Sequence, residues 1–359
     1  MSESAEQLKR EYRSYALRKF LFVLVCLILA ILMFWLSLGI GTRELGLWQS
    51  LDYFLDHISG KTYPVGTLEW YDELIIWNYR VPRAIFSLIA GGGLSVAGAV
   101  MQGVMKNPLA DPYTTGVSSG AYLGASVAIV LGFSLGGSIV SGSGIIINAI
   151  VFSMMPIIAI AAMGPYFRKS PASLILAGVA ISSAFSSVTS LLLISTDNSS
   201  LEEVYKWSVG TLTEITWDSL PLVTVVEFAG LLILIPISNK INLMALDDKD
   251  AKSMGLDSER LRVICLVILS VMAAVVICYA GVIGFVGLIV PHIIRLILGS
   301  DNKYLIPASA GFGAAFLLTC DVISRMIDVS ATVPVGVVTS FIGAPIFLGL
   351  IILQRKGMW

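Results

Sequence analysis

The sequence predicts an all-α integral membrane protein with about ten transmembrane helices, built as a single membrane-spanning domain over residues 1–359. Composition is the first reason: 56% of the residues are hydrophobic and only 13% are charged, whereas about a quarter of a soluble domain is charged. The second reason is that the apolar residues form runs of about 20, which is the length that crosses a bilayer as a helix. Lipid is therefore the predicted solvent for most of the chain.

The first predicted span covers residues 20–40 and follows a basic segment, residues 1–19, that is expected on the cytoplasmic side. A secretory signal peptide has a similar basic flank, but its apolar region is only about 7–15 residues long. The run after residue 19 is longer than that, and no small-x-small cleavage site follows it. It is therefore predicted to be a membrane helix.

Nine further apolar runs follow, each bounded by charged or turn-forming residues. The boundary between the seventh and eighth spans is the weakest, because only Tyr279-Ala280-Gly281 marks it. The loop at residues 195–220 contains LEEVYKW, which predicts a short amphipathic helix at the outer interface. The nine predicted spans are residues 84–105, 114–132, 144–164, 172–194, 220–238, 262–280, 282–298, 305–326 and 335–354.

The lysines and arginines predict the orientation, because they are enriched in cytoplasmic loops. With ten spans and the N-terminus inside, 17 of the 23 lysines and arginines fall on the inner side. Both termini are therefore expected in the cytoplasm, with the chain in the inner (cytoplasmic) membrane. The six outer cations are Arg43, Lys61, Arg80, Arg83, Lys206 and Arg325.

The stretch MQGVMKNPLADPYTTGVSSGA, residues 101–121, interrupts the apolar pattern between the second and third spans. Pro108 and Pro112 stop helices, because proline lacks an N–H group and disfavours a helical conformation in the preceding residue. The Asn107 side chain can bond to backbone groups that the ended helix leaves free. The interruption therefore predicts a turn at the inner face rather than a site of chemistry.

Charged residues inside the predicted spans are few, and such residues are the usual functional candidates in a membrane protein. Glu227 lies in the sixth span, and Asp321 and Arg325 lie four residues apart in the ninth, where they can pair on one helix face. An ion-driven secondary transporter needs a chain of such acids, and a membrane enzyme needs a catalytic constellation. Both remain distant alternatives, since the sequence contains neither feature. No basic patch points to nucleic acid as a partner.

The inner loop at residues 239–261 contains LMALDDKDAKSMGLDSERL. We expect a short helix that begins at Asp247, carries Ala251 and Met254 on one face, and ends at Gly255 in the left-handed conformation. Asp257 or Ser258 is expected to cap the next helix. Such a rigid protrusion is typical of a docking surface.

Four stretches together resemble the FecCD-type permease subunits of ABC importers for iron complexes and vitamin B12. The resemblance runs from about Arg80 to Arg355 and is most specific in the N-P-L-A-x-P and G-F-V-G-L-x-x-P-H elements. The stretches are RVPRAIFSLIAGGGLSVAGAVMQGVMKNPLADPYTTGVSSGA, MALDDKDAKSMGLDSERLR, GVIGFVGLIVPHIIR and CDVISRMIDVSATVPVGVVTSFIGAPIFLGLI.

The resemblance implies the ten-helix fold of a type II ABC importer permease, which works by alternating access. It also implies a second permease subunit, for which a homodimer is the expectation, together with two cytoplasmic ABC ATPases and one external substrate-binding protein. ATP and Mg²⁺ would bind to the ATPases, so this chain is expected to hold no cofactor, no metal and no catalytic residue. The third, fifth and tenth spans are our candidates for lining the pathway.

The resemblance also assigns roles to three groups of residues. Those implied for coupling to the ATPases are Leu246, Asp247, Asp248, Ala251, Met254, Gly255 and Leu256. Those implied for docking the binding protein are Arg80, Arg83 and Arg325. Those implied for the turn at the gate of the pathway are Asn107, Pro108, Leu109, Ala110, Pro112 and Gly116.

Thr332 departs from the family pattern, which usually has Glu-Leu-Pro before Val-Gly at the start of the tenth span. The missing acid affects the expected contacts on the outer side but not the expected fold. Ferric siderophore is the first expectation for the cargo, followed by cobalamin or another corrinoid, then haem, then molybdate. The small and apolar residues of the predicted pathway do not distinguish among these cargoes.

Overall fold

The computed structural model describes residues 2–41, 43, 45–138, 142–163, 171–246, 248–327 and 333–354. The secondary structure of these residues is helical and contains no strand. Three short helical turns of other types, η1 (Ile76–Arg80), η2 (Pro112–Thr115) and η3 (Trp217–Ser219), join the longer elements. The α-helices are α1 (Ser2–Gly39), α2 (Leu47–Ile58), α3 (Leu68–Ile75), α4 (Val81–Val104), α5 (Val117–Leu131), α6 (Ser143–Met163), α7 (Pro171–Ile194), α8 (Asn198–Ser208), α9 (Leu220–Leu234), α10 (Ser238–Leu243), α11 (Asp248–Ser253), α12 (Ser258–Ala280), α13 (Val286–Leu298), α14 (Asn302–Ile327) and α15 (Val335–Gln354).

The predicted spans all appear as helices. Among the described residues, 7 helical stretches are long and apolar enough to cross a membrane. The predicted third, eighth and tenth spans are the shorter apolar helices α5, α13 and α15. The predicted interfacial helix is also present, as α8. The expectation of an all-α membrane protein with about ten apolar helices is confirmed.

The starts of two helices differ from the starts of the predicted apolar spans. The helix of the seventh span begins at Ser258, ahead of the apolar run from residue 262, and the Asp257 side chain accepts the N–H of Arg260 at 3.0 Å, which confirms the predicted cap. The eighth span begins at Val286 rather than at residue 282. Gly281 (φ 69°) and Phe285 (φ 70°) both adopt positive φ angles, so the chain between them is not helical.

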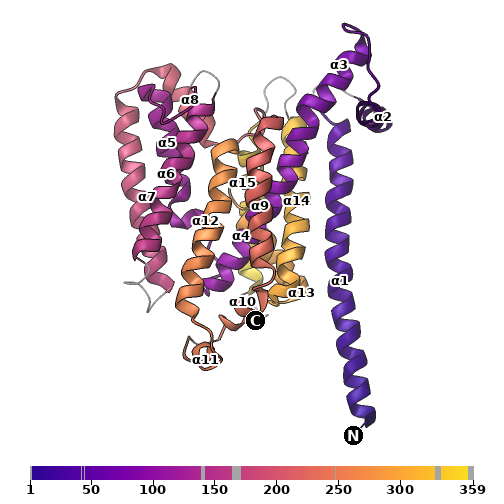
Figure 1. The fold of residues 1–359 in the computed structure, drawn as a ribbon, viewed down its shortest axis with the longest axis vertical. Coiled ribbons are helices and arrows are strands. Elements are labelled where there is room, and N and C mark those ends of the chain that lie inside the picture. Colours follow the sequence, from indigo (N-terminus) through magenta and orange to yellow (C-terminus); the bar gives the residue numbers. More distant parts are fainter. Residues whose placement is uncertain are drawn as a thin grey trace.

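Helix α4 forms the centre of the bundle, and α9, α12, α13 and α14 pack around it (Figure 1). In the most apolar 18-residue stretch of the span Leu68–Val104, which contains α4, 83% of the residues are buried. The corresponding shares are only 28% for α1 and 17% for α7. Glycines allow this central position, because a Cβ on Gly91 would overlap the backbone of Gly313 in α14. α1 lies at one edge of the bundle, and α5, α6 and α7 lie at the other.

The two ends of the bundle carry different elements. The short helices α10 and α11 lie at one end, which we call the coupling end, and the N-terminal end of α1 points the same way (Figure 1). The helices α2, α3 and α8 lie at the opposite end. Figure 1 also places the C-terminal end of α15 on the side of the coupling end.

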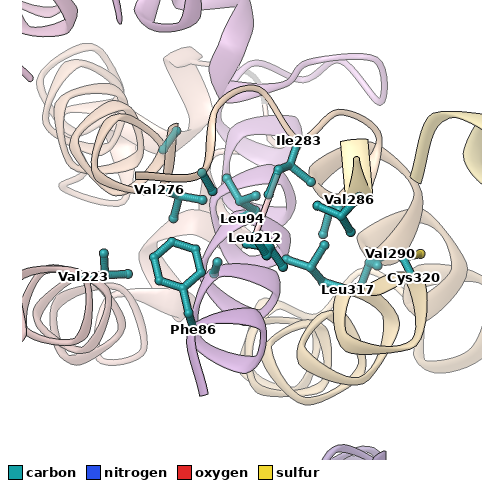
Figure 2. Packing of buried hydrophobic residues seen from close by; sticks show 14 of the residues in the cluster. Phe86, Leu94, Leu212, Val223, Val276, Ile283, Val286, Val290, Leu317 and Cys320 are labelled. Atoms are coloured by element: carbon teal, nitrogen blue, oxygen red, sulfur yellow. The ribbon is translucent and has the colours of Figure 1, made fainter. Parts of the chain in front are cut away.

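The largest apolar cluster lies where α4 meets α12, α13 and α14 (Figure 2). Phe86 and Leu94 of α4 contribute to it, together with Leu317 of α14. Leu212 and Ile283, from the connecting segments before α9 and α13, complete the cluster. These irregular segments are therefore fixed by the core rather than loosely attached to it.

Candidate functional site

The turn after α4 reverses the chain at the coupling end, as the sequence predicts. α4 ends at Val104, and Lys106 adopts a positive φ of 49°. Asn107 Oδ1 accepts the N–H of Leu109 at 2.9 Å, so the predicted local role of this amide is confirmed. Leu109 itself is exposed.

The second half of the turn starts the returning helices. Ala110 is buried, and its N–H donates to the carbonyl of Asn107 at 3.1 Å. Pro112 opens η2, where the absence of an N–H leaves no hydrogen bond unmade. Gly116 (φ 89°) then precedes α5, as expected, and an added Cβ there would lie 3.3 Å from Pro156 Cβ.

The turn is attached to the start of α13 by contacts that the sequence did not predict. The Tyr113 hydroxyl donates to the carbonyl of Ile283 at 3.0 Å. In α4, which precedes the turn, a Cβ on Gly98 would overlap the carbonyl group of Gly287. The backbones of α4 and α13 are therefore in direct contact. The N-P-L-A-x-P and G-F-V-G-L-x-x-P-H elements themselves lie side by side, since a Cβ on Gly287 would lie 3.3 Å from Asp111 Oδ2, and together with these contacts they form one unit.

Asp111 is a buried carboxyl within this unit and lies outside the membrane-spanning segments. Its Oδ1 accepts the N–H of Tyr113 at 2.8 Å. Burial raises the pKa of Asp111 to about 6, although the hydrogen bond from Tyr113 opposes the rise. Its position between the two prolines was the only feature of the sequence that could have identified Asp111 as a site residue.

The predicted coupling segment forms a short helix and a left-handed turn. α11 covers Asp248–Ser253, and Gly255 follows with φ 82°, as predicted. The N–H of Leu256 donates to the carbonyl of Ala251 at 3.0 Å and closes the turn. Asp247, the predicted start of the helix, lies outside the described residues.

The side chains of the coupling segment divide between the interior and the surface. Ala251 is fully buried, whereas Leu246 and Met254 are 42% and 60% exposed. The N–H of Met254 continues the helical pattern by donating to the carbonyl of Asp250 at 3.2 Å, but its side chain lies on the surface while that of Ala251 is buried. Two large apolar side chains are therefore presented at the coupling end.

Two cations connect the coupling segment to the end of α4. Lys106 Nζ donates to the carbonyl of Leu246 at 2.6 Å and lies 3.3 Å from Asp248 Oδ1. Arg262 Nη2 lies 3.2 Å from the same oxygen, and its Nε donates to the carbonyl of Val104 at 3.2 Å. Sequence reasoning gave no role to either cation, although Arg262 is a charged residue at the start of an apolar run.

A polar cavity of about 470 Å³ lies beside this junction. Pro108 lines it together with Lys106 and with Asn242 of α10. Arg295 lines it from α13 and donates to Gln102 Oε1 of α4 at 2.8 Å. Hydrogen bonds thus join α4 to α12 and to α13 at the coupling end, and Asn302 Nδ2 of α14 donates to Asn242 Oδ1 of α10 at 2.8 Å.

The three arginines predicted to dock a binding protein come together at the opposite end, around a cavity of about 260 Å³. Asp321 is fully buried and lies 2.7 Å from Arg83 and 3.0 Å from Arg325, which confirms the predicted pair within α14. Arg80 and Arg325 also donate to carbonyl groups in the last turn of α1, at Leu38 and Ser37. They thereby satisfy helix-end acceptors, a role that the sequence pattern did not indicate.

A wide groove of about 690 Å³ runs along one face of α15. Glycines allow close contact among the segment after α8, the segment after α12 and the start of α15. The N–H of Gly336 donates to the carbonyl of Gly210 at 3.1 Å, and a Cβ on Gly281 would overlap the carbonyl of Trp207. Phe341 is 80% exposed at this groove. The described residues that line it include no charged side chain.

Helix α7, a predicted lining element, presents hydroxyl groups on an exposed face. The hydroxyls of Ser183, Ser187 and Ser190 each donate to the carbonyl four residues earlier, at 2.8–2.9 Å. All three residues are exposed, which is unusual for polar groups in a membrane helix unless a partner or an aqueous path covers them. Thr332 lies outside the described residues, so the structure does not describe the departure from the family pattern.

The model of the FecCD transport family matches residues 28–354. The chain belongs to the FecCD transport family. The hemin transport system permease HmuU of Yersinia pestis is 34% identical over 78% of this chain and 84% of its own length. The cobalamin import system permease BtuC of Halobacterium salinarum is 36% identical over 78% of this chain and 73% of its own length.

The fold agrees with this assignment. A solved inward-facing ABC transporter, described as being of the metal-chelate type, matches with a TM-score of 0.78 and 29% identity over 92% of this chain and 98% of that one. The FecCD chain is thus a permease subunit of an ABC importer, and ATP hydrolysis is carried out by separate ATPase subunits. Permease subunits of these importers bind no cofactor themselves, and they form permease dimers.

Proposed function

We propose that this FecCD permease imports a ferric siderophore by alternating access. The groove along α15 carries the proposal, because its volume of about 690 Å³ in one chain, without a charged lining residue, suits a bulky complex whose metal is covered by organic ligand. Two such grooves would face one another across a permease dimer. The exposed serines of α7 would add weak hydrogen-bonding groups that solvate a polar cargo without holding it.

Coupling is proposed to begin at Leu246–Leu256, where two ABC ATPases that carry ATP and Mg²⁺ would dock against the exposed Leu246 and Met254. Closure of the ATPases would displace α11. The displacement would reach α4 through Asp248, which contacts both Lys106 and Arg262. The turn at Asn107–Gly116 would then move with α4 and act as the inner gate.

The arginine cavity at the opposite end is the proposed docking site for the substrate-binding protein. Arg83 and Arg325 share the one buried carboxylate of Asp321, and Arg80 lines the same cavity, which leaves excess positive charge for carboxylates of the partner. This arrangement requires the coupling end, and therefore both termini, to face the cytoplasm. The distribution of lysine and arginine supports that orientation.

The cargo is the part of the proposal that relatives leave open, since they include permeases named for hemin, cobalamin, molybdate and Fe(3+)-citrate. The test is uptake of labelled ferric siderophore and labelled cobalamin in cells that lack the gene and in the same cells with it restored. Siderophore uptake alone should depend on the gene. Dependence of cobalamin uptake alone would contradict the proposed cargo and favour a corrinoid. If neither depends on it, the siderophore proposal fails, and haem and molybdate are the cargoes to measure next.

A further inference from the structure

A cavity of about 640 Å³ lies between α1 and the start of α14 at the coupling end. It is lined by no residue of the coupling segment. Its polar part is formed by Arg13 and Ser14 of α1 and by Lys303 of α14. Its apolar part is formed by Leu17 and Phe20 of α1, whose side chains are 57% and 61% exposed. The cavity therefore joins a basic site to a surface that faces lipid.

Lys19 places a third positive charge beside this cavity, although it does not line it. It is only 5% exposed, and its Nζ lies 4.3 Å from the ring centroid of Tyr15 and 5.3 Å from that of Tyr304, which lines the cavity. Within the described part of the chain, neither Lys19, Arg13 nor Lys303 takes part in an ion pair. No acidic residue is among the described residues that line the cavity. A buried ammonium without a counter-charge favours an anionic occupant.

The depth of the cavity matches the level of lipid headgroups. About 20 apolar residues are needed to cross the hydrocarbon core, and in α1 these are the residues from Phe20 to Gly39. Arg13–Lys19 therefore lies in the headgroup region. α14 begins at Asn302, so Lys303 and Tyr304 lie at the start of their own membrane helix. Tyrosine is favoured at this depth because its ring is apolar and its hydroxyl is polar.

We infer that this cavity binds the phosphate headgroup of an anionic phospholipid from the leaflet at the coupling end. Arg13 and Lys303 contact the phosphate, the buried charge of Lys19 attracts it from beside the cavity, and Leu17 and Phe20 contact the upper part of an acyl chain. Basic pockets between membrane helices recognise anionic headgroups by this combination of charge and apolar surface. A free phosphate would use the cations but not the exposed apolar wall, so the lipid is the favoured source. The inference does not depend on which cargo is carried.

The test is binding of dioleoyl phosphatidylglycerol to the purified full-length chain in detergent, followed by native mass spectrometry and by the shift in the thermal unfolding midpoint. Dioleoyl phosphatidylcholine is the neutral comparison. The wild type should bind phosphatidylglycerol more tightly than phosphatidylcholine. Replacing both Arg13→Gln and Lys303→Gln should weaken phosphatidylglycerol binding about 20- to 30-fold, since each cation near the surface contributes about fivefold.

Two further variants separate this site from a general charge effect. Lys240→Gln removes an exposed cation at the same end of the bundle, on α10, and should leave binding unchanged. The exchange Arg13→Lys with Lys303→Arg keeps both charges and should keep binding within about threefold. Equal binding of the two lipids, or equal weakening in the Lys240 variant, would overturn the inference. So would displacement of phosphatidylglycerol by millimolar inorganic phosphate, which would identify a soluble anion as the ligand.

Discussion

Gly98 is the residue at which the centre of the bundle tolerates least change. An added Cβ would overlap the carbonyl group of Gly287, which belongs to the backbone of α13 and cannot rotate away. Gly98→Ala should therefore lower the free energy of unfolding by on the order of 3 kcal/mol, the upper range for overpacking a core. Thermal unfolding of the purified chain in detergent would measure the loss.

Gly103 supplies the matched control within the same helix. A Cβ there would meet Ile241 Cγ2 at 3.5 Å, which is an ordinary contact. Gly103→Ala should therefore leave the unfolding midpoint unchanged or raise it slightly, because alanine favours the helix over glycine. A similar fall in the unfolding midpoint of both variants would contradict this prediction. It would mean that α4 is destabilised by a side chain at either glycine, whether or not it overlaps Gly287.

The buried Asp111 predicts a pH dependence of stability. Its pKa in the folded chain is raised from 3.8 to about 6, so folding favours the protonated carboxyl. The free energy of unfolding should therefore fall as pH rises from about 4 to about 6, and remain lower above that. Asp111→Asn keeps the oxygen acceptor for Tyr113 but carries no charge. The variant should be more stable than the wild type at pH 8, by up to about 3 kcal/mol, and the difference should vanish near pH 4.

Unfolding midpoints at several pH values would measure this dependence, with Asp218→Asn as a control at an exposed carboxylate. A constant difference between wild type and Asp111→Asn at every pH would contradict the assignment, because it would reflect packing rather than ionisation.

At the scale of an element, the coupling segment depends on the backbone of Gly255. This residue has φ 82°, and no atom lies within 4 Å of the position that a Cβ would take. Gly255→Val would therefore act through backbone strain alone, of about 1–2 kcal/mol. We expect the variant to assemble with its ATPases but to lower uptake at least tenfold, while basal ATP hydrolysis stays within about twofold.

Gly60 allows the same strain to be applied elsewhere, since it has φ 78° and is equally open. It lies in the loop after α2, at the end opposite to the coupling segment. Gly60→Val should leave uptake within about twofold of the wild type. If both variants lose uptake equally, the strain lowers the amount of folded protein and the proposed role of the segment in coupling is wrong.

The helices could be predicted from the sequence because hydropathy and length alone define a span. The cap at Asp257 was also predictable, since aspartate is a common N-cap residue, whereas the start at Val286 was not, because positive φ angles at Gly281 and Phe285 change a boundary without changing hydropathy. The turn chemistry of Asn107 was also predictable, since its hydrogen bond is local. Contacts between distant segments, such as Lys106 with Asp248, were not, because they depend on how helices assemble.

At the scale of the whole molecule, the two most specific sequence elements meet where Gly287 lies beside Asp111, and the contact of Gly98 with Gly287 and the hydrogen bond from Tyr113 extend this unit. The coupling segment joins this unit through Lys106 and Arg262. A displacement at the coupling end therefore has a continuous packed route to the groove beside Gly284 and Phe341. α1 stands outside that route, consistent with its low burial.

The proposed homodimer makes the last prediction, which concerns the exposed stripe of α15. Val337, Phe341, Leu348 and Ile352 are 44–80% exposed, and an isologous dimer would place this face of one chain near the same face of the other. Because Phe341 also lines the proposed cargo groove, Phe341→Cys should be linked to its copy by a bismaleimide reagent long enough to span that groove, whereas Phe228→Cys, 55% exposed on α9, should not. The native cysteines are buried and should contribute no background. A linked pair of this chain with a different permease would contradict the homodimer, and equal linking at both positions would indicate random collision in the membrane.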